Sequence, residues 1–421
     1  MDKIVITGGR KLKGEVRISG SKNSALPIMA ATLLSEDESV LENVPDLRDI
    51  QTMLRLLRSL GARAQFEKGT VTIKPGRNLN PIAPYKLVST MRASVCVLGP
   101  LLARMGHAEV SIPGGCVIGL RPIDLHLKGL QALGAKMEIQ HGYVHARVKR
   151  KLKGSEIFLG GAFGSSVLAT GNVMMAACLA QGRTSIENAA CEPEVVDLAN
   201  FLKKMGAKIT GEGSPRIEIE GVKKLHGAKF PVIPDRIEAG TFIFAAAVTG
   251  GDVAIKNLEP SHQNAVMDKL AQAGVRLERG KNTLRVRRKG RLKPVDVTTL
   301  PYPGFPTDLQ AQMMALMSVT PGISVITEKI YPDRFMHVSE LNRMGSRIML
   351  EGPSAIVHGV KQLSGAPVMA SDLRASAALV IAGLVAEGTT EVHRVYHLDR
   401  GYEKIEEKFS ALGASIHREK E

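Results

Sequence analysis

One cysteine of this chain lies in a setting that suits chemistry. Cys116 ends the run P-G-G-C at residues 113–116 and is followed by Gly119, a composition typical of a loop. Arg121 is close enough in the sequence to favour the thiolate form of such a cysteine. A free cysteine is more often a small buried side chain without reactivity. From this context alone, both interpretations stay open.

A carboxylate and a lysine elsewhere could supply a base and an anion site. Asp308 follows Pro306 and Thr307 at an expected helix start, so it is either a base or an acidic residue that stabilises the first turn. Lys22 and Asn23 open a predicted helix after a Gly-Ser pair, where backbone N–H groups and a cation can bind an anion. An ordinary capped helix start would explain the same two residues.

Length and composition limit the kind of protein. A chain of 421 residues suggests two or three domains, or one architecture built from repeats. Hydrophobic residues at 44% and charged residues at 23% exclude disordered and fibrous classes. Four cysteines without a C-x-x-C pair indicate neither a disulfide framework nor a cysteine zinc site, and are typical of reduced cytoplasmic thiols. The start lacks the order of a signal peptide, and the apolar run at residues 375–386 is too short to span a bilayer, so we expect a cytoplasmic protein.

The net charge of 56 − 41 = +15 indicates either a nucleic-acid surface or a site that gathers cations for small anionic substrates. The densest basic runs, residues 149–153 and 285–289, contain no aromatic residue, and the chain has no Trp. Base stacking is therefore disfavoured, and we expect these runs to be solvated strand ends or loops.

Self-similarity is the main organising feature. A predicted helix that ends in Leu, Met or Ala followed by glycine recurs six times, at Gly61, Gly134, Gly206, Gly274, Gly345 and Gly413, with a spacing of about 70 residues. In the first repeat, periodicity predicts a strand over 11–19, a helix over 24–34, a strand over 39–44, a helix over 47–60 and a closing hairpin over 64–73. Each repeat therefore has the order β-α-β-α-β-β. Helices over 173–179, 241–249 and 375–386 are apolar nearly all round and are expected to be buried.

Several separated motifs occur in one order along the chain. They are S-G-S-K-N-S-A-L-P (19–27), T-M-R-A-S (90–94), P-G-G-C-V-I-G-L-R-P-I-D-L-H (113–126), E-P-E-V-V-D (192–197), P-D-R-I-E-A-G-T-F (234–242), F-P-T-D-L-Q-A-Q (305–312), R-F-M-H (334–337), S-D-L-R-A-S (371–376) and D-R-G-Y (399–402). With the repeats, they closely resemble the enolpyruvyl transferases. The resemblance implies an α/β (α+β) fold, a two-domain inside-out α/β barrel of six β-α-β-α-β-β repeats with helices inside and sheets outside. The implied domains are residues 22–233, and 1–21 with 234–421, with the active site in the cleft between them.

The activity implied by the resemblance is transfer of the enolpyruvyl group of phosphoenolpyruvate to the 3-hydroxyl of UDP-N-acetylglucosamine, with release of phosphate. Cys116 would donate a proton to the CH2 group and add transiently to the substrate, and Asp308 would be the base. Cys96, Cys178 and Cys191 are expected to be unreactive. The cations implied around phosphoenolpyruvate are Lys22, Arg92, Arg121 and Arg400, with Arg334 and Arg374 as further candidates that could instead pair with Asp333 or Asp372.

The resemblance also implies the acceptor contacts. Arg121, Pro122, Ile123, Asp124 and Leu125 would line the uracil pocket through their backbone, and Ser166, Val167 and Ile330 are further matching positions. Asn23 is implied as a further substrate-binding residue beside Lys22. The chain departs from the family at three places: Leu168 stands where a glycine is common, residues 160–164 contain no lysine, and Cys191 replaces an expected arginine.

Two alternatives remain open at this stage. One is the sibling activity of the 5-enolpyruvylshikimate-3-phosphate synthase type, which uses the same donor; the other is a basic repeat protein that binds nucleic acid. No G-K-S/T follows residues 160–166 and the chain has no H-E-x-x-H, so we expect no nucleoside triphosphate site, no metal and no cofactor.

Overall fold

The computed structural model describes residues 2–114, 123–162 and 164–420. These residues form two compact units. Unit 1 contains residues 2–19 and 234–420, and unit 2 contains residues 20–114 and 123–233. Each unit has its own hydrophobic core.

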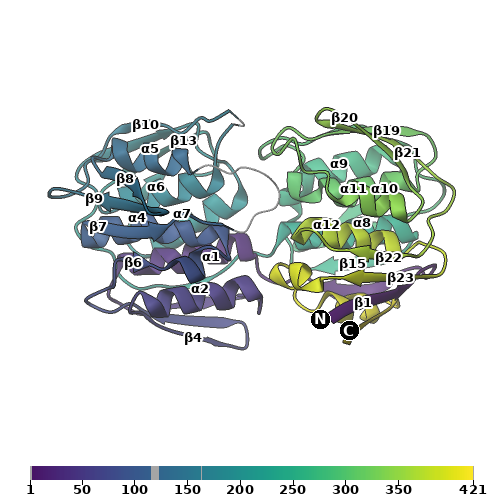
Figure 1. The fold of residues 1–421 in the computed structure, drawn as a ribbon, viewed down its shortest axis with the longest axis horizontal. Coiled ribbons are helices and arrows are strands. Elements are labelled where there is room, and N and C mark those ends of the chain that lie inside the picture. Colours follow the sequence, from purple (N-terminus) through teal and green to yellow (C-terminus); the bar gives the residue numbers. More distant parts are fainter. Residues whose placement is uncertain (1, 115–122, 163, 421) are drawn as a thin grey trace. The chain divides into compact units, whose positions relative to one another are not determined.

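The described residues form six four-stranded sheets, three in each unit (Figure 1). The strands of unit 2 lie in the orders β14 (Lys229–Pro231), β3 (Ser39–Glu42), β5 (Thr70–Lys74), β4 (Arg63–Glu67); β6 (Ile82–Ala83), β7 (His107–Ser111), β9 (Tyr143–Arg147), β8 (Lys136–Gln140); and β10 (Glu156–Phe158), β11 (Arg183–Glu187), β13 (Arg216–Glu220), β12 (Lys208–Thr210). The strands of unit 1 lie in the orders β16 (Arg276–Arg279), β17 (Thr283–Arg287), β15 (Asp252–Lys256), β2 (Lys13–Arg17); β18 (Val297–Thr298), β19 (Ile323–Thr327), β21 (Ser354–His358), β20 (Arg347–Glu351); and β22 (Pro367–Met369), β23 (Thr389–His393), β1 (Asp2–Thr7), β24 (Ser415–Lys420).

The helices connect these strands in the predicted order. Unit 2 has the helices α1 (Lys22–Ala31), η1 (Thr32–Leu34), α2 (Arg48–Ser59), α3 (Tyr85–Val88), η2 (Arg92–Val97), α4 (Leu98–Met105), α5 (Asp124–Ala132), α6 (Val167–Ala177) and α7 (Pro193–Lys204). Unit 1 has α8 (Arg236–Thr249), η3 (Pro260–Gln263), α9 (Asn264–Gln272), η4 (Thr307–Leu309), α10 (Gln310–Ser318), α11 (His337–Arg343), α12 (Leu373–Gly383), η5 (Val395–Arg400) and α13 (Ile405–Ala411).

Three sheets combine strands of different repeats, while the first five repeats keep the predicted β-α-β-α-β-β order along the chain. Strand β2, the first strand of repeat one, pairs in parallel with β15 in unit 1, and β14 takes the corresponding place beside β3 in unit 2. The amino-terminal strand β1 completes the last sheet between β23 and β24. Local periodicity predicts a strand but not its partner, so it could not reveal these exchanges.

The helices lie inside each unit and the sheets outside, as expected (Figure 1). Helices α8, α10 and α12 pack against one another in unit 1, and α6 packs against α1 and α4 in unit 2. Residues 173–177 of α6, 241–249 of α8 and 375–383 of α12 are all buried, as their largely apolar sequences require. The predicted buried helices are confirmed.

The six marker glycines end their helices in the left-handed region, with φ between 87° and 101°. A residue with a Cβ atom would be strained there, which explains why glycine recurs at this point of every repeat. No helix among the described residues is long and apolar enough to cross a membrane.

Candidate active site

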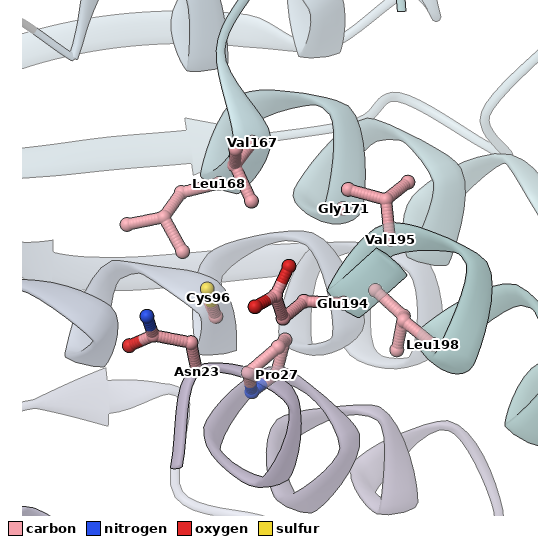
Figure 2. A pocket seen from close by; sticks show the side chains of 9 residues that line it. All are labelled: Asn23, Pro27, Cys96, Val167, Leu168, Gly171, Glu194, Val195 and Leu198. Atoms are coloured by element: carbon pink, nitrogen blue, oxygen red, sulfur yellow. The ribbon is translucent and has the colours of Figure 1, made fainter. Parts of the chain in front are cut away.

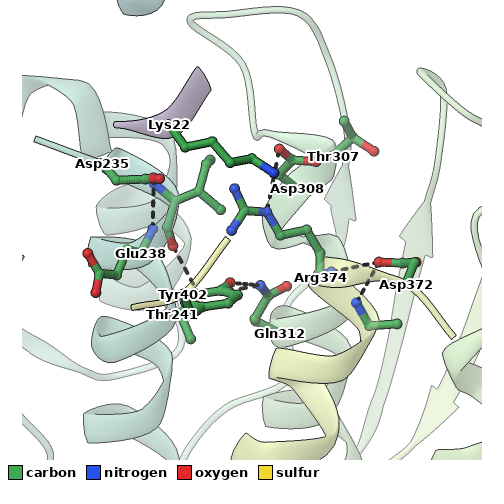
Figure 3. Close-up of polar contacts among 12 residues, drawn as sticks. Lys22, Asp235, Glu238, Thr241, Thr307, Asp308, Gln312, Asp372, Arg374 and Tyr402 are labelled. Carbon is green, nitrogen blue, oxygen red and sulfur yellow. Dashed lines mark hydrogen bonds and ion pairs between the residues drawn. The ribbon is translucent and has the colours of Figure 1, made fainter. Parts of the chain in front are cut away.

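Asp308 lies in η4, just before α10, and two buried arginines of unit 1 hold its carboxylate. Arg334 Nη1 donates to Asp308 Oδ1 at 2.8 Å. Arg374 Nε lies 3.7 Å from Asp308 Oδ2 (Figure 3). Both arginine side chains are almost fully buried, whereas that of Asp308 is 29% exposed. The carboxylate is therefore the accessible member of the group, as a base that meets a substrate must be.

These contacts correct one alternative from the sequence. The sequence left Asp333 and Asp372 open as ion-pair partners of Arg334 and Arg374. In the structure both arginines pair with Asp308 instead. Asp372 instead caps α12, where its Oδ1 accepts hydrogen bonds from the backbone N–H groups of Arg374 (2.6 Å) and Ala375 (2.9 Å).

The Arg374 guanidinium lies against Asp308 and Tyr402 without a hydrogen bond of ordinary length to either. None of its three nitrogens has a hydrogen-bond partner among the described residues, although the side chain is only 2% exposed. Its central carbon lies 5.2 Å from the centre of the Tyr402 ring. Burial lowers the pKa of Arg374, but Tyr402, Asp308 and Asp235 outweigh it and hold this pKa above its ordinary value. The group therefore stays a cation with free donors, which suits a carboxylate or phosphate.

Tyr402 is itself fixed by a buried polar cluster. Its hydroxyl lies 2.8 Å from Thr241 Oγ1, which donates its hydrogen to the Ile237 carbonyl, so Tyr402 is the donor (Figure 3). Burial raises the pKa of Tyr402 above its ordinary value, which keeps the phenol neutral. The sequence reasoning missed Tyr402, although it ends the D-R-G-Y motif.

Ile330 and Arg400 are the other predicted positions of unit 1. Ile330 follows β19 and is half-buried; its backbone N–H donates to Glu328 Oε1 at 2.8 Å. Arg400 is the last residue of η5 and is also half-buried.

Lys22 begins α1 in unit 2, as predicted, with Ser21 as the N-cap that accepts from Ser24 N. Its Nζ lies 2.8 Å from Asp49 Oδ2 in the first turn of α2, and both side chains are less than 10% exposed. Asp49 was not predicted, because the pair joins two helices that no local pattern connects. Its carboxylate fixes the place of the Lys22 ammonium group.

A second buried carboxylate, Asp197 of α7, supports the same helix start. It accepts hydrogen bonds from Ser24 Oγ and from Ile233 N, the latter at 3.2 Å. Asp197 is 4% exposed, and burial raises its pKa to about 6. It ties the first turn of α1 to the end of unit 2.

Arg92 and the start of α5 are linked through a buried histidine. Arg92 begins η2, and Asp124 and Leu125 begin α5 after the buried Ile123. Burial lowers the pKa of His126 to about 3, with a smaller effect from the charge of Arg92, so the ring stays neutral. Asn172 Nδ2 lies 3.0 Å from His126 Nδ1 and 2.9 Å from the Val95 carbonyl, which joins α6 to both segments.

Ser166 and Val167 open α6 beside a small hollow. Ser166 caps the helix by accepting from Ala169 N at 3.3 Å. Val167, Leu168, Asn23, Cys96 and Glu194 are among the residues that line the hollow (Figure 2). The structure thus brings Asn23 and Val167, two predicted substrate-binding positions 144 residues apart (167 − 23), to one place, and Leu168 lies there with them.

Three predicted site residues, Cys116, Arg121 and Pro122, lie outside the described residues. Cys96 and Cys178 are fully buried, and burial raises the pKa of each thiol to about 12, as expected of unreactive cysteines. Cys191 is partly buried, and burial, with the charge of Glu192, raises its pKa.

The basic runs behave as predicted. Residues 149–151 are exposed in the connection after β9, and Arg285 and Arg287 of β17 pair with Asp252 at 2.7 and 3.0 Å. Among the described residues, no group of three or more His, Cys, Asp and Glu side chains could hold a metal ion.

Comparisons with known proteins identify the family and the fold. The model of the family described as EPSP synthase (3-phosphoshikimate 1-carboxyvinyltransferase) matches residues 6–409. The chain belongs to this family of carboxyvinyl, or enolpyruvyl, transferases. It is 57% identical over 420 residues to the UDP-N-acetylglucosamine 1-carboxyvinyltransferase of Methylacidiphilum infernorum, covering 99% of both chains.

Solved structures agree with this assignment. The enolpyruvyl transferase NikO from Streptomyces tendae is 25% identical, with a TM-score of 0.89 over 99% of this chain and 98% of that chain. An EPSP synthase from Acinetobacter baumannii, at 19% identity and a TM-score of 0.75 over the whole of both chains, shares the fold. The two-domain inside-out α/β architecture is therefore confirmed.

Proposed function

We propose that the chain transfers the enolpyruvyl group of phosphoenolpyruvate to the 3-hydroxyl of UDP-N-acetylglucosamine and releases phosphate. The observation that carries the proposal is the accessible Asp308 carboxylate held by two buried arginines, in a chain that is 57% identical along its length to a protein named for this reaction. The reaction would be the first committed step of peptidoglycan precursor synthesis, a cytoplasmic process.

The chemistry needs an acid, a base and cations. Protonation of the CH2 carbon makes the neighbouring carbon electrophilic, the sugar oxygen bonds to it and loses its proton, and phosphate leaves as the methyl group gives a proton back. In this proposal Cys116 is the acid and Asp308 the base. Lys22, Arg92, Arg121 and Arg400 bind the phosphate and carboxylate, and Arg374 offers unused donors to the same groups.

Substrate contacts are proposed on both units. On unit 2, Asn23, Ile123–Leu125, Ser166 and Val167 would bind the nucleotide sugar, with Arg121 and Pro122 beside them. On unit 1, Ile330 and Asp308 would meet the sugar, and Arg334 and Arg374 are further candidates for binding phosphoenolpyruvate. We propose the domain limits 22–233, and 1–21 with 234–421; the partners are two small molecules, with no role for nucleic acid or a membrane.

The test is phosphate release from phosphoenolpyruvate with a panel of acceptors. UDP-N-acetylglucosamine should support release, and shikimate 3-phosphate should not. Release with shikimate 3-phosphate alone would establish the sibling activity instead. A gel shift with DNA at physiological salt, expected to be negative, tests the nucleic-acid alternative.

A further inference from the structure

Glu328 is a fully buried carboxylate that no part of the proposed mechanism uses. It follows the last residue of β19 and is 0% exposed. Burying a carboxylate is costly unless its oxygens are hydrogen-bonded. Four donors satisfy it: Thr299 Oγ1 at 2.6 Å, Ile330 N at 2.8 Å and Tyr331 N at 3.0 Å on Oε1, and Thr307 Oγ1 at 2.8 Å on Oε2.

The Oε2 contact leads to Asp308. Since a carboxylate only accepts, the single hydroxyl hydrogen of Thr307 is directed at Glu328, and the Thr307 oxygen is left as an acceptor. Arg334 Nη1 donates to that oxygen at 3.0 Å and to Asp308 Oδ1 at 2.8 Å. The direction of Arg334, and hence the place of the Asp308 carboxylate, is set through Thr307 by Glu328.

The Oε1 contacts lead to the turn that carries Ile330. By accepting from two successive backbone N–H groups, Glu328 fixes the conformation of residues 330–331. Thr299 strengthens this arrangement, since its hydroxyl donates to Oε1 and accepts from Lys329 N at 3.0 Å. One carboxylate thus holds two separate parts of unit 1 in a fixed relation.

We infer that Glu328 is a positioning residue: it fixes the position of the base, Asp308, relative to the acceptor contact at Ile330. The roles of Asp308 and Ile330 in this inference rest on the proposed function. Glu328 does not touch the substrate. It acts through the Thr307 hydroxyl on one side and through the backbone of Ile330 on the other.

The test uses the Thr307 hydroxyl, which can be removed without changing the volume. Thr307→Val should lower kcat about 10-fold or more, because a small misplacement of a reacting group is expensive. The KM for UDP-N-acetylglucosamine should change less than about 2-fold, since the Ile330 turn is untouched. Thr307→Ser keeps the hydroxyl and should retain about half or more of the wild-type kcat. Thr327→Val is the matched control: its hydroxyl pairs with Ser354 at 2.9 Å in the same sheet, outside this network, and kcat should not change.

Glu328→Gln should lower kcat and also raise the KM for UDP-N-acetylglucosamine, because it disturbs both the contact to Thr307 and the contacts to the backbone of residues 330–331. Calorimetric binding of UDP-N-acetylglucosamine alone should weaken in Glu328→Gln and not in Thr307→Val. Thr307→Ser as slow as Thr307→Val, or Glu328→Gln with wild-type kcat and KM, would overturn the inference. If Glu328→Gln does not fold, the Thr307 pair still decides. A wild-type enzyme that is inactive with UDP-N-acetylglucosamine refutes the proposed function, whereas an active wild type with an unaffected Thr307→Val refutes only this inference.

Discussion

Asp197 gives a quantitative prediction about stability and pH. Burial disfavours the charge of its carboxyl and raises the pKa from the ordinary value of 3.8 to about 6 in the folded chain. The folded state therefore binds the proton more tightly than the unfolded state. Stability from this group is highest below pH 4, falls as the pH rises from about 4 to 6, and stays low above pH 6. The shift of about 2 units corresponds to about 3 kcal/mol as an upper limit.

The perturbation is Asp197→Asn, which cannot ionise. If its amide oxygen takes the place of Oδ2, the contacts from Ser24 and Ile233 are kept. The free energy of unfolding at pH 8, measured by urea denaturation, should rise by about 1–3 kcal/mol relative to wild type. At pH 4 the two proteins should differ by less than about 0.5 kcal/mol.

Asp37→Asn, at an exposed position, is the matched control. Its free energy of unfolding relative to wild type should be the same at pH 4 and at pH 8. Turnover of Asp197→Asn should stay near wild type, because the α1 start that carries Lys22 keeps its contacts. A variant that is equally destabilised at pH 4 and pH 8 would refute the reasoning, since the loss would then come from hydrogen bonding and not from a buried charge.

Three further predictions concern the proposed reaction. Asp308→Ala should lower kcat about 100-fold or more while calorimetry shows little loss of UDP-N-acetylglucosamine affinity; affinity lost in proportion to rate would make Asp308 a binding residue. Cys116→Ser should abolish phosphate release, whereas Cys116→Asp should retain part of it, because a carboxyl can still deliver a proton. An epoxide that alkylates thiols should label Cys116 of the wild-type protein; a label found by mass spectrometry on Cys96, Cys178 or Cys191 instead would contradict this role. Leu168→Gly should lower the KM for UDP-N-acetylglucosamine and leave the KM for phosphoenolpyruvate unchanged, because Leu168 lines the hollow beside Asn23. If calorimetry shows no gain in affinity for UDP-N-acetylglucosamine, Leu168 does not hinder binding of this acceptor.

Local patterns in the sequence predict much of the fold but not its exchanges. The marker glycines and the all-apolar helices predict the repeats and their buried helices, because both signals depend on neighbouring residues. The pairing of β2 with β15 joins residues more than 230 positions apart, and nothing in the β2 sequence distinguishes it from a strand that stays in its own repeat.

The same limit applies to the site. Ser21 as an N-cap and Asp308 at a helix start could be predicted, since capping is local. The partners that hold these residues could not: Asp49 reaches Lys22 from another helix, and Asp197 reaches Ser24 across 173 positions. From the sequence, Glu328 after a strand would be predicted to be an exposed acidic residue. In the structure it is fully buried and accepts a hydrogen bond from Thr307.

The most direct test of the proposed function is the identity of the product. The wild-type chain is incubated with phosphoenolpyruvate and UDP-N-acetylglucosamine, and the product is analysed by mass spectrometry and NMR. We expect one enolpyruvyl ether on the 3-oxygen of the sugar and one phosphate released per product formed. Unchanged UDP-N-acetylglucosamine, or an enolpyruvyl group formed only on shikimate 3-phosphate, would contradict it.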